Sequence, residues 1–322
     1  MSAVGDLAAL AALLRDGRGV AAKRDVAVMT QGLAAGAVRL GDDCAAIPDG
    51  DGFLLFAIEG FIETFVAADP WFAGWCGVMV NVSDIAAMGG RPTAVVNAIW
   101  SAGASDALAL TRGLRDAADA LGVPIVGGHT NLSASQAQLS VAILGRAQRL
   151  LTSFDARPGD MLIAAIDLRG RYREPFPNWD AATAAPAGRM RGDLAILPSL
   201  AEDGLCRAAK DISQAGLVGT AIMLAECSGV GMRIDPASVP IPSDVPLPRW
   251  LQSFPSFGYL LSVAPRDVAD VLSRFAARDL AAAAIGHVTD SHGVELVSGD
   301  QRATVWDFAE RPLMQLAPGR AG

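Results

Sequence analysis

Apolar positions along the chain follow two spacings, one typical of helices and one typical of strands. Residues 71–88 predict a helix that Gly89 and Gly90 end, and residues 105–121 predict a second helix capped by Ser105. The apolar stripe of the second helix consists of Leu110, Leu114, Ala118 and Leu121. Short apolar runs such as TAVVNAIW and LSVAILG, bounded by Gly, Pro or polar residues, predict strands. This mixture favours α/β or α+β layering over an all-helical bundle.

The order of these elements predicts two lobes behind a short N-terminal region. We expect residues 1–35 to form two helices, over 6–16 and 25–35, joined by the flexible glycine-containing sequence GRGVAAK. Residues 36–150 read as a sheet with helices against it, and residues 151–322 read as a second lobe of α+β type.

One segment of the second lobe, residues 169–192, fits neither a helix nor a strand. It places three arginines beside three aromatic residues: Arg169, Arg171, Arg173, Tyr172, Phe176 and Trp179. Arginines interleaved with aromatics can grip an anionic or planar ligand, so we expect a mobile substrate lid. The alternative is an ordinary loop whose aromatic rings pack on the second lobe.

Composition narrows the classes of function. The chain has 322 residues, of which 52% are apolar and 19% charged, and its formal net charge is −8. It offers no basic stripe for nucleic acid, so phosphates would have to be bound with the help of metal ions. The apolar N-terminal stretch is too short and too interrupted by charge for a membrane span or a signal peptide.

The four cysteines, Cys44, Cys76, Cys206 and Cys227, lie too far apart in sequence to suggest a zinc site or a disulfide framework. We therefore expect a cytoplasmic protein. The chain has only two lysines, Lys23 and Lys210, and a compact ammonium group suits a phosphate. Chance is the competing explanation for this scarcity.

Acidic residues gather at the ends of the predicted elements, where Asp42, Asp43, Glu59, Asp84 and Asp211 are found. Magnesium prefers oxygen ligands, so a few carboxylates converging on substrate phosphates would form a site. Taken singly, each is more readily interpreted as a helix cap or a solvated acid, and only the pattern of all five favours a metal site. We expect Asp43 and Asp84 to share one metal-sized site.

Three further motifs carry polar residues or glycines in positions that suit a nucleotide. Asn81 and Asp84 stand three apart in VNVSDIAAMGG and therefore share a helix face, where Asn is otherwise a poor helix residue. The turn Gly127, Gly128, His129 and Thr130 follows a strand and would let backbone N–H groups approach an anion, although alone it is equally consistent with a plain turn. Asp211 precedes a helix whose N-terminus would attract phosphate, and the alternative is that Ser213 is simply the N-cap of that helix.

Taken in order, GDDCAAI, AIEGFIETFV, VNVSDIAAMGGRP, GGHT and KDISQAGL resemble the landmarks of one superfamily, over roughly residues 40–290. It includes aminoimidazole ribonucleotide (AIR) synthetase, thiamine-monophosphate kinase, selenophosphate synthetase and the hydrogenase-maturation carbamoyl dehydratase. The resemblance implies a two-lobed PurM-like fold: an N-terminal α/β lobe that pairs with its twin into a dimeric β-barrel, and a C-terminal α+β lobe. It also implies an ATP cleft with several Mg²⁺ ions, and a reaction that activates an oxygen by phosphorylation.

By this resemblance Asp42 and Asp43 match the metal-binding pair of the superfamily, and Asn81 with Asp84 matches its helix-borne phosphate and metal contacts. Asp211 matches the acid of its DISDGL-like segment.

Two positions depart from the pattern. Glu59 stands where the superfamily usually has Asp, and His129 replaces the Asp of a kinase-like GGDT turn and resembles the GGH turn of selenophosphate synthetases. A neutral imidazole does not replace the charge of a carboxylate.

Other departures argue against each named activity. The chain has PSFGYLLSV where thiamine-monophosphate kinase has an acidic GGEDYEL-like turn, it ends LAPGRAG instead of in a reactive cysteine, and GRGVAAK lacks the cysteine of selenophosphate synthetase. An AIR synthase-related branch of its own is therefore the expectation.

The sequence supports three functional hypotheses. The first is a Mg-ATP-dependent enzyme, ligase-like or kinase-like, in which Lys23 and Asp211 act on an unknown small-molecule substrate. The second is a nucleotide-binding regulatory or scaffold protein that has lost turnover, and the third is a structural dimer without a ligand. A homodimer is expected because LLFAI and VVNAIW are apolar strands that a single small lobe would leave partly exposed.

Overall fold

The computed structural model describes residues 6–30, 38–186 and 188–315. The chain divides into two compact units, each built around one large sheet. The five-strand unit comprises Asp43–Leu150 and Ala182–Ser199, and the seven-strand unit comprises Met1–Asp42, Leu151–Ala181 and Leu200–Gly322. Within the described ranges, no helix is long and apolar enough to cross a membrane.

The five-strand unit is a mixed sheet with helices. Its elements are β1 (Ala45–Asp49), β2 (Gly52–Phe61), α4 (Glu63–Ala68), α5 (Pro70–Ala87), β3 (Arg91–Trp100), α6 (Ala104–Leu121), β4 (Ile125–Asn131), β5 (Gln138–Ala147) and α7 (Arg189–Leu194). The strand order is β1-β2-β5-β3-β4, and every pair is antiparallel except β3 with β4. The helix α8 (Ile196–Glu202) crosses the boundary between the units.

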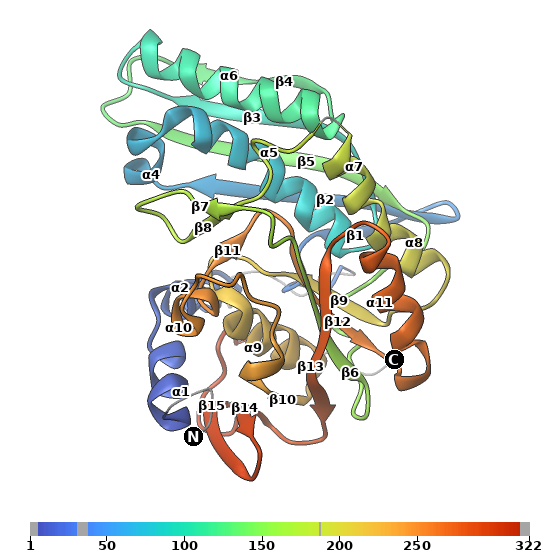
Figure 1. Ribbon diagram of the computed structural model, residues 1–322. Coiled ribbons are helices and arrows are strands. Elements are labelled where there is room, and N and C mark those ends of the chain that lie inside the picture. The colour runs from blue at the N-terminus through green and yellow to red at the C-terminus, as the bar shows by residue number, and fades with distance from the viewer. Residues whose placement is uncertain (1–5, 31–37, 187, 316–322) are drawn as a thin grey trace. The chain divides into compact units, whose positions relative to one another are not determined.

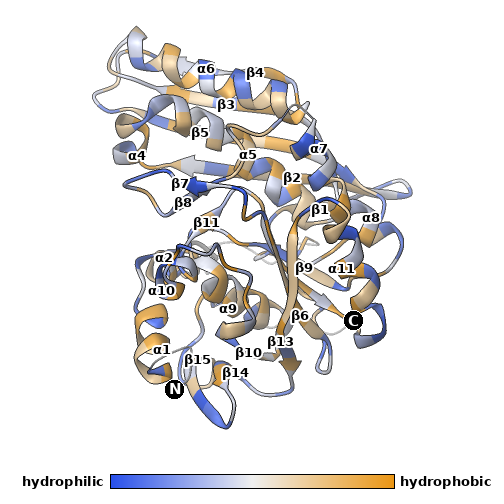
Figure 2. Ribbon diagram, in the orientation of Figure 1, coloured by the Kyte–Doolittle hydropathy of each residue, from blue (hydrophilic) through white to orange (hydrophobic). Residues whose placement is uncertain are grey.

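The helices α5 and α6 pack side by side on this sheet (Figure 1). Glycines allow the close approach: a Cβ on Gly74 would lie 2.2 Å from the Leu110 carbonyl oxygen, and one on Gly113 would lie 1.9 Å from that of Trp71. α6 alternates hydrophobic and hydrophilic stretches in Figure 2, as its predicted stripe requires, and that stripe is buried. Its N-cap is Gly103 and not Ser105, so the cap lies two residues earlier than its sequence signal.

The two faces of the five-stranded sheet differ. On β2, Leu55 and Ala57 are buried, whereas their neighbours Phe56 and Ile58 are 51% and 67% exposed. Since successive strand residues point to opposite faces, one face is covered and the other is open. Large apolar residues with exposed side chains also occur on the other strands of the sheet: Ile47, Val96, Val126 and Leu144.

The seven-strand unit contains the remaining elements of the chain. They are α1 (Leu7–Arg15), α2 (Arg18–Lys23), α3 (Asp25–Thr30), β6 (Met161–Ile166), β7 (Arg171–Tyr172), β8 (Asn178–Asp180), β9 (Ala208–Asp211), α9 (Gly216–Ser228), β10 (Gly231–Ile234), η1 (Pro236–Ser238), α10 (Leu247–Trp250), β11 (Phe254–Pro255), β12 (Gly258–Val263), η2 (Pro265–Asp267), α11 (Val268–Ala276), β13 (Ala281–Thr289), β14 (Gly293–Ser298) and β15 (Gln301–Asp307). The large sheet has the order β15-β14-β10-β13-β6-β12-β9, and a small sheet has the order β11-β8-β7.

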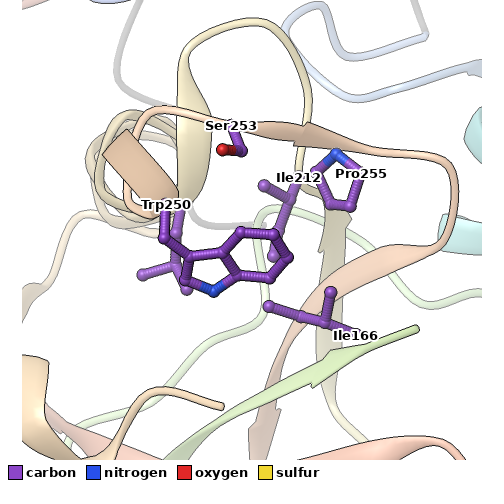
Figure 3. A pocket seen from close by; sticks show the side chains of 6 residues that line it. Ile166, Ile212, Trp250, Ser253 and Pro255 are labelled. Atoms are coloured by element: carbon purple, nitrogen blue, oxygen red, sulfur yellow. The ribbon is translucent and has the colours of Figure 1, made fainter. Parts of the chain in front are cut away.

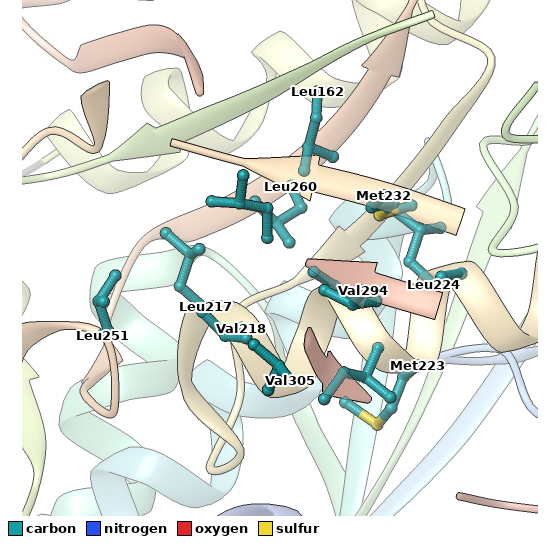
Figure 4. Close-up of a cluster of buried hydrophobic side chains, with 14 of the residues drawn as sticks. Leu162, Leu217, Val218, Met223, Leu224, Met232, Leu251, Leu260, Val294 and Val305 are labelled. Atoms are coloured by element: carbon teal, nitrogen blue, oxygen red, sulfur yellow. The ribbon is translucent and has the colours of Figure 1, made fainter. Parts of the chain in front are cut away.

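The large sheet is covered on both faces, by α9 on one side and α11 on the other (Figure 1). On β12, Leu260 belongs to the core cluster beneath α9 (Figure 4), whereas Tyr259 contacts Phe257, which in turn contacts Phe275 of α11. Every residue of β12 is buried. The core of this unit therefore lies on both sides of one strand.

The N-terminal region differs from its sequence-based expectation. GRGVAAK was expected to be a flexible connection, but Arg18–Lys23 forms α2. A Cβ on Gly19 would lie 2.1 Å from the Gln214 carbonyl oxygen, so this glycine serves close packing against the turn before α9. That turn also corrects a cap, because α9 has Ala215 and not Ser213 as its N-cap. The expected helix over 25–35 is described only to Thr30, and its remaining residues lie outside the described ranges.

The segment 169–192 contains two short strands that the sequence did not predict, within a course that is otherwise mostly irregular up to α7. β7 and β8 form an antiparallel hairpin, and β8 pairs with β11. Trp179 is only 5% exposed and donates its Nε1–H to the Asp167 carbonyl at 3.0 Å, while the Tyr172 hydroxyl lies 2.6 Å from Ser253 Oγ. The packing of these two rings follows the alternative reading of the segment, in which aromatics pack on the lobe.

A small recess in the same unit lies beside this hairpin. Figure 3 shows its lining, which is apolar except for the Ser253 hydroxyl: Ile166, Ile212, Leu217, Trp250, Ser253 and Pro255. Since Ser253 Oγ already bonds Tyr172 and donates to the Arg249 carbonyl at 3.0 Å, the recess presents no free polar group to a ligand.

Candidate functional site

The helix α5 positions the central residues of the candidate site. It begins at Pro70, and its N-cap Asp69 accepts a hydrogen bond from the Phe72 amide at 3.1 Å. It ends before Gly89, whose φ of 73° only glycine adopts readily. These fixed ends place Asn81 and Asp84 in its second half, one turn apart on one face.

Asn81 is fully buried and only half satisfied. Its Nδ2 donates to the Gly77 carbonyl at 2.8 Å, but its Oδ1 has no hydrogen-bond donor within the described part of the chain. Burying an acceptor without a partner costs about 1–3 kcal/mol, so such a group needs an explanation. An amide oxygen held in this way can accept from a ligand or coordinate a hard cation.

Asp43 and Asp84 converge in the five-strand unit. Each offers a carboxylate oxygen, and these oxygens lie within 4.8 Å of one another. The expectation that the two residues approach to within a metal-sized distance is therefore confirmed. Oxygens bound to one Mg²⁺ at about 2.1 Å lie at most about 4.2 Å apart, so a small side-chain adjustment brings this pair around one ion. An oxygen-only donor set suits Mg²⁺ or Ca²⁺ and not a soft metal.

Asp42 lies in the seven-strand unit, although it is bonded to Asp43 in the chain. Its carboxylate accepts the Ser153 amide, at 3.1 Å on one oxygen and 3.0 Å on the other, and the Ser153 hydroxyl at 2.7 Å. The two members of the predicted metal pair thus have different surroundings.

Glu59 lies on β2 two positions after Ala57 and four after Leu55, so its side chain points to the same covered face of the sheet. Among the described residues, it is not grouped with Asp43 and Asp84 as a third close ligand.

The turn Gly127–Thr130 is part of β4, and all four of its residues are exposed. On β3, the buried Val95 and Ile99 point to the covered face of the sheet, so Ala98 points to the open face. His129 pairs with Ala98 across the strands and therefore lies on the open face as well. The ring centroids of His129 and Trp100 are 6.2 Å apart.

Asn97, which was not among the predicted site residues, lies beside the predicted nucleotide-binding motif Gly127–Thr130. A Cβ on Gly128 would lie 2.8 Å from Asn97 Oδ1 and 2.6 Å from its carbonyl oxygen, so Gly128 leaves room for this amide. The available signal was an Asn in the middle of the apolar run TAVVNAIW, where β-propensity disfavours it.

Asp211 and Lys23 belong to the seven-strand unit. Asp211 ends β9, is 4% exposed, and accepts the Thr220 hydroxyl on its backbone oxygen at 3.3 Å. Lys23 ends α2 and is half-buried, and its ammonium has no hydrogen bond or ion pair to another described residue. The second lysine, Lys210, is buried in β9.

The chain belongs to the AIR synthase related protein family. The model of the N-terminal domain of that family matches residues 41–147, and the model of its C-terminal domain matches residues 184–299. Two of its relatives are uncharacterized proteins. The one from Synechocystis sp. is 48% identical over 86% of each chain, and the one from Methanocaldococcus jannaschii is 36% identical over 74% of each chain. Thiamine-monophosphate kinase of Pyrococcus abyssi is 31% identical over 81% of this chain and 86% of its own.

Solved structures confirm a PurM-like fold of mixed α/β type. PurL of Thermotoga maritima complexed with ATP superposes with a TM-score of 0.69 at 20% identity, over 86% of this chain and 47% of its own. The chain thus spans about half the length of PurL. AaThiL complexed with AMPPCP and TMP superposes with a TM-score of 0.66 at 21% identity, over 87% of this chain and 95% of its own.

Proposed function

We propose that the protein is a Mg-ATP-dependent enzyme that transfers the γ-phosphoryl group of ATP to an oxygen of a small-molecule substrate. The observation that carries this proposal is the pair Asp43 and Asp84, with carboxylate oxygens within 4.8 Å, one helical turn from the buried amide of Asn81. Oxygen donors of this kind fit Mg²⁺. Relatives whose names include thiamine-monophosphate kinase and selenide, water dikinase support the reaction class.

The residues divide into metal and nucleotide groups. Asp43 and Asp84 would hold Mg²⁺, which when bound would neutralise negative charge on the phosphates. Asn81 Oδ1, which can only accept, would serve as a further oxygen ligand for the cation, and Gly127–Thr130 offers backbone N–H groups to the nucleotide.

We assign two roles in the seven-strand unit on the sequence motif alone. Asp211 contributes the further carboxylate, and Lys23 neutralises charge that develops on the transferred phosphoryl group. In the transfer, the bond from the γ-phosphorus to the bridging oxygen breaks as the bond to the substrate oxygen forms. ADP leaves, and the substrate oxygen, if it carries a proton, loses it to solvent.

We further propose a homodimer formed through the open face of the five-stranded sheet, closing into the family's β-barrel. Phe56, Ile58 and Val126 are each more than half exposed on that sheet, and exposed apolar patches of this kind mark association surfaces. In this scheme residues 36–150 are the ATP-binding and dimerisation domain, and residues 151–322 are the C-terminal domain.

The test is calorimetric titration of the full chain with AMPPCP in the presence and absence of Mg²⁺, followed by an ATP turnover assay. Asp84→Asn keeps the shape of the side chain but removes its charge, and we expect at least about tenfold weaker Mg²⁺-dependent binding and loss of turnover. The matched control is Asp119→Asn, an exposed acid on α6 of the same unit, which leaves both unchanged. Absence of Mg²⁺-dependent binding to the wild type overturns the proposal.

A second candidate is a nucleotide-binding regulatory protein without turnover. The specific observation in its favour is His129, which places an imidazole on the open face of the sheet where kinase-like relatives carry a carboxylate. Tight Mg²⁺-dependent AMPPCP binding with no phosphoryl transfer to any acceptor, water included, would favour this candidate.

A further inference from the structure

The two neighbouring aspartates of GDDCAAI have different physical situations. Both carboxylate oxygens of Asp42 accept hydrogen bonds from Ser153, and the shortest, from the hydroxyl, is 2.7 Å. Ser153 is fully buried. Hydrogen bonds to an ionised carboxylate are stronger than neutral ones, so a cation would have to displace good donors to use these oxygens.

The partner of Asp42 is itself fixed. The Ser153 carbonyl accepts the Ser228 hydroxyl at 2.7 Å, and Ser228 Oγ accepts the Ala156 amide at 3.1 Å. Ser228 is the last residue of α9, so the Asp42 carboxylate is tied to a long buried helix through one intermediate residue.

Two further contacts hold the chain just before Asp42. The Cys227 thiol lies 3.4 Å from the Gly41 carbonyl oxygen, and the Arg39 guanidinium lies 3.7 Å from the centre of the Phe154 ring. Residues 39–42, which we call the strap, therefore contact residues 153–154 and the end of α9 at three successive points. A strap held at several points has little freedom left at its last residue.

We infer that Asp42 is a structural anchor and not a metal ligand. Its carboxylate holds the strap against Ser153 within the seven-strand unit, whereas the ligand role at the proposed cation site falls to the Asp43 carboxylate. This inference rests on the proposed Mg²⁺ site, and it divides the aspartate pair into one anchor and one ligand.

The experiment is a double-mutant cycle on the full chain with Asp42→Ala, Ser153→Ala and the double variant, compared with Asp43→Asn. Two quantities are measured for each protein: the melting temperature without metal, and the Mg²⁺ dependence of AMPPCP binding. We expect Asp42→Ala to lower the metal-free melting temperature by about 2–4 °C or more, and the double variant to melt no lower than Asp42→Ala alone. Mg²⁺ dependence should weaken only a few-fold in these three proteins.

Asp43→Asn should differ from these three proteins, with at least tenfold weaker Mg²⁺-dependent binding. If Asp42→Ala fails to fold, Ser153→Ala and the milder Asp42→Asn carry the same comparison. The inference is overturned if Asp42→Asn weakens Mg²⁺ binding as much as Asp43→Asn does while melting like the wild type, or if the Asp42 and Ser153 effects simply add. A wild type that binds no Mg-AMPPCP defeats the proposed function instead, and the melting cycle then still decides whether Asp42 is an anchor.

Discussion

The two large sheets of this protein use their faces differently. In the seven-strand unit, β12 is buried on both faces, beneath α9 and beneath α11. In the five-strand unit, α5 and α6 cover one face, and the other exposes large apolar residues such as Phe56 and Ile58. A sheet covered on both faces has completed its burial within the chain, whereas a sheet with one open apolar face has not.

Buried polar groups occur in both units. In the seven-strand unit, the buried Asp160 accepts from the Ser262 hydroxyl at 2.8 Å and pairs with Arg207 at 3.3 Å, although Arg207 Nε has no hydrogen bond among the described residues. In the five-strand unit, the buried Asn81 keeps an oxygen without a donor within the described ranges. What distinguishes Asn81 is that it lies one helical turn from Asp84. This amide and the open apolar face are the features of the five-strand unit that point to function.

The largest expected effect compares neighbouring positions on a strand in each unit. Leu260→Ala and Leu261→Ala should each cost about 2–5 kcal/mol of unfolding free energy, because both side chains are fully buried on opposite faces of β12. Leu55→Ala should cost a similar amount, but Phe56→Ala less than about 1 kcal/mol, since Phe56 faces the open side. Denaturant titration of dilute protein measures all four, and equal costs at Leu55 and Phe56 would remove the contrast between the faces.

The open face itself is tested by a charge. Ile58→Asp should weaken self-association at least about tenfold, because a carboxylate would be buried without a partner in the dimer. Leu108→Asp is the matched control, since Leu108 is 59% exposed on α6 and outside the sheet. Sedimentation over a concentration series reports the effect. A wild type that stays monomeric at micromolar concentration contradicts the dimer, and equal weakening by both variants contradicts its location.

The covered face depends on the glycine contacts between α5 and α6. Gly113→Ala should cost about 1–3 kcal/mol, because its Cβ would meet the Trp71 carbonyl at 1.9 Å and the helices would have to separate. Gly60→Ala on β2 is the control, as the nearest atom to its Cβ would be Ser140 Oγ at 3.7 Å. Thermal unfolding compares the two, and a neutral Gly113→Ala would mean that the helix layer is loosely packed.

Local patterns predicted the parts of the fold that depend on local physics. α5 and α6 were predicted because a helical stripe and a glycine stop lie within each segment. The helix α2 was missed because glycines are poor helix formers, and its support comes from contact with Gln214, far away in sequence. The β7–β8 hairpin was missed because its support also comes from outside the segment: Trp179 donates to the Asp167 carbonyl, and the Tyr172 hydroxyl bonds Ser253.

Of the candidate site, the sequence predicted the residues carried by recognisable motifs but not the contacts that form only on folding. The order of the motifs brought Asp43 and Asp84 together correctly, because the spacing between motifs preserves the topology of the family. Asp42 and Asp43 could not be told apart from local sequence, since the difference between them is made by Ser153, 111 positions from Asp42. Asn97 was hidden because its relation to Gly128 exists only after β3 and β4 pair.

The smallest expected effect concerns Glu226, a polar residue used for structure in the seven-strand unit. Its carboxylate accepts backbone N–H groups of Leu313, Met314 and Gln315, at distances from 2.9 to 3.2 Å, and so fixes the described end of the chain. Burial raises the pKa of Glu226 above its usual value, although the backbone hydrogen bonds oppose this. The folded protein therefore holds the proton more tightly than the unfolded chain does.

The sign of the pH dependence follows from this raised pKa. The Glu226 contribution to stability is greatest below the ordinary glutamate pKa of 4.5 and declines as the pH rises through the higher folded value, because ionisation is then harder in the folded state. Glu226→Gln removes that ionisation, so the stability of the variant relative to the wild type should rise with pH in this window and level off above it. Denaturant titrations of both proteins at a series of pH values from about 4 to 7 measure the difference. A difference that is flat, or that changes in the opposite direction, would show that the three amide donors outweigh burial. Mg²⁺-dependent binding should be the same in both proteins, since Glu226 belongs to the seven-strand unit and is not one of the residues proposed to bind Mg²⁺ or ATP.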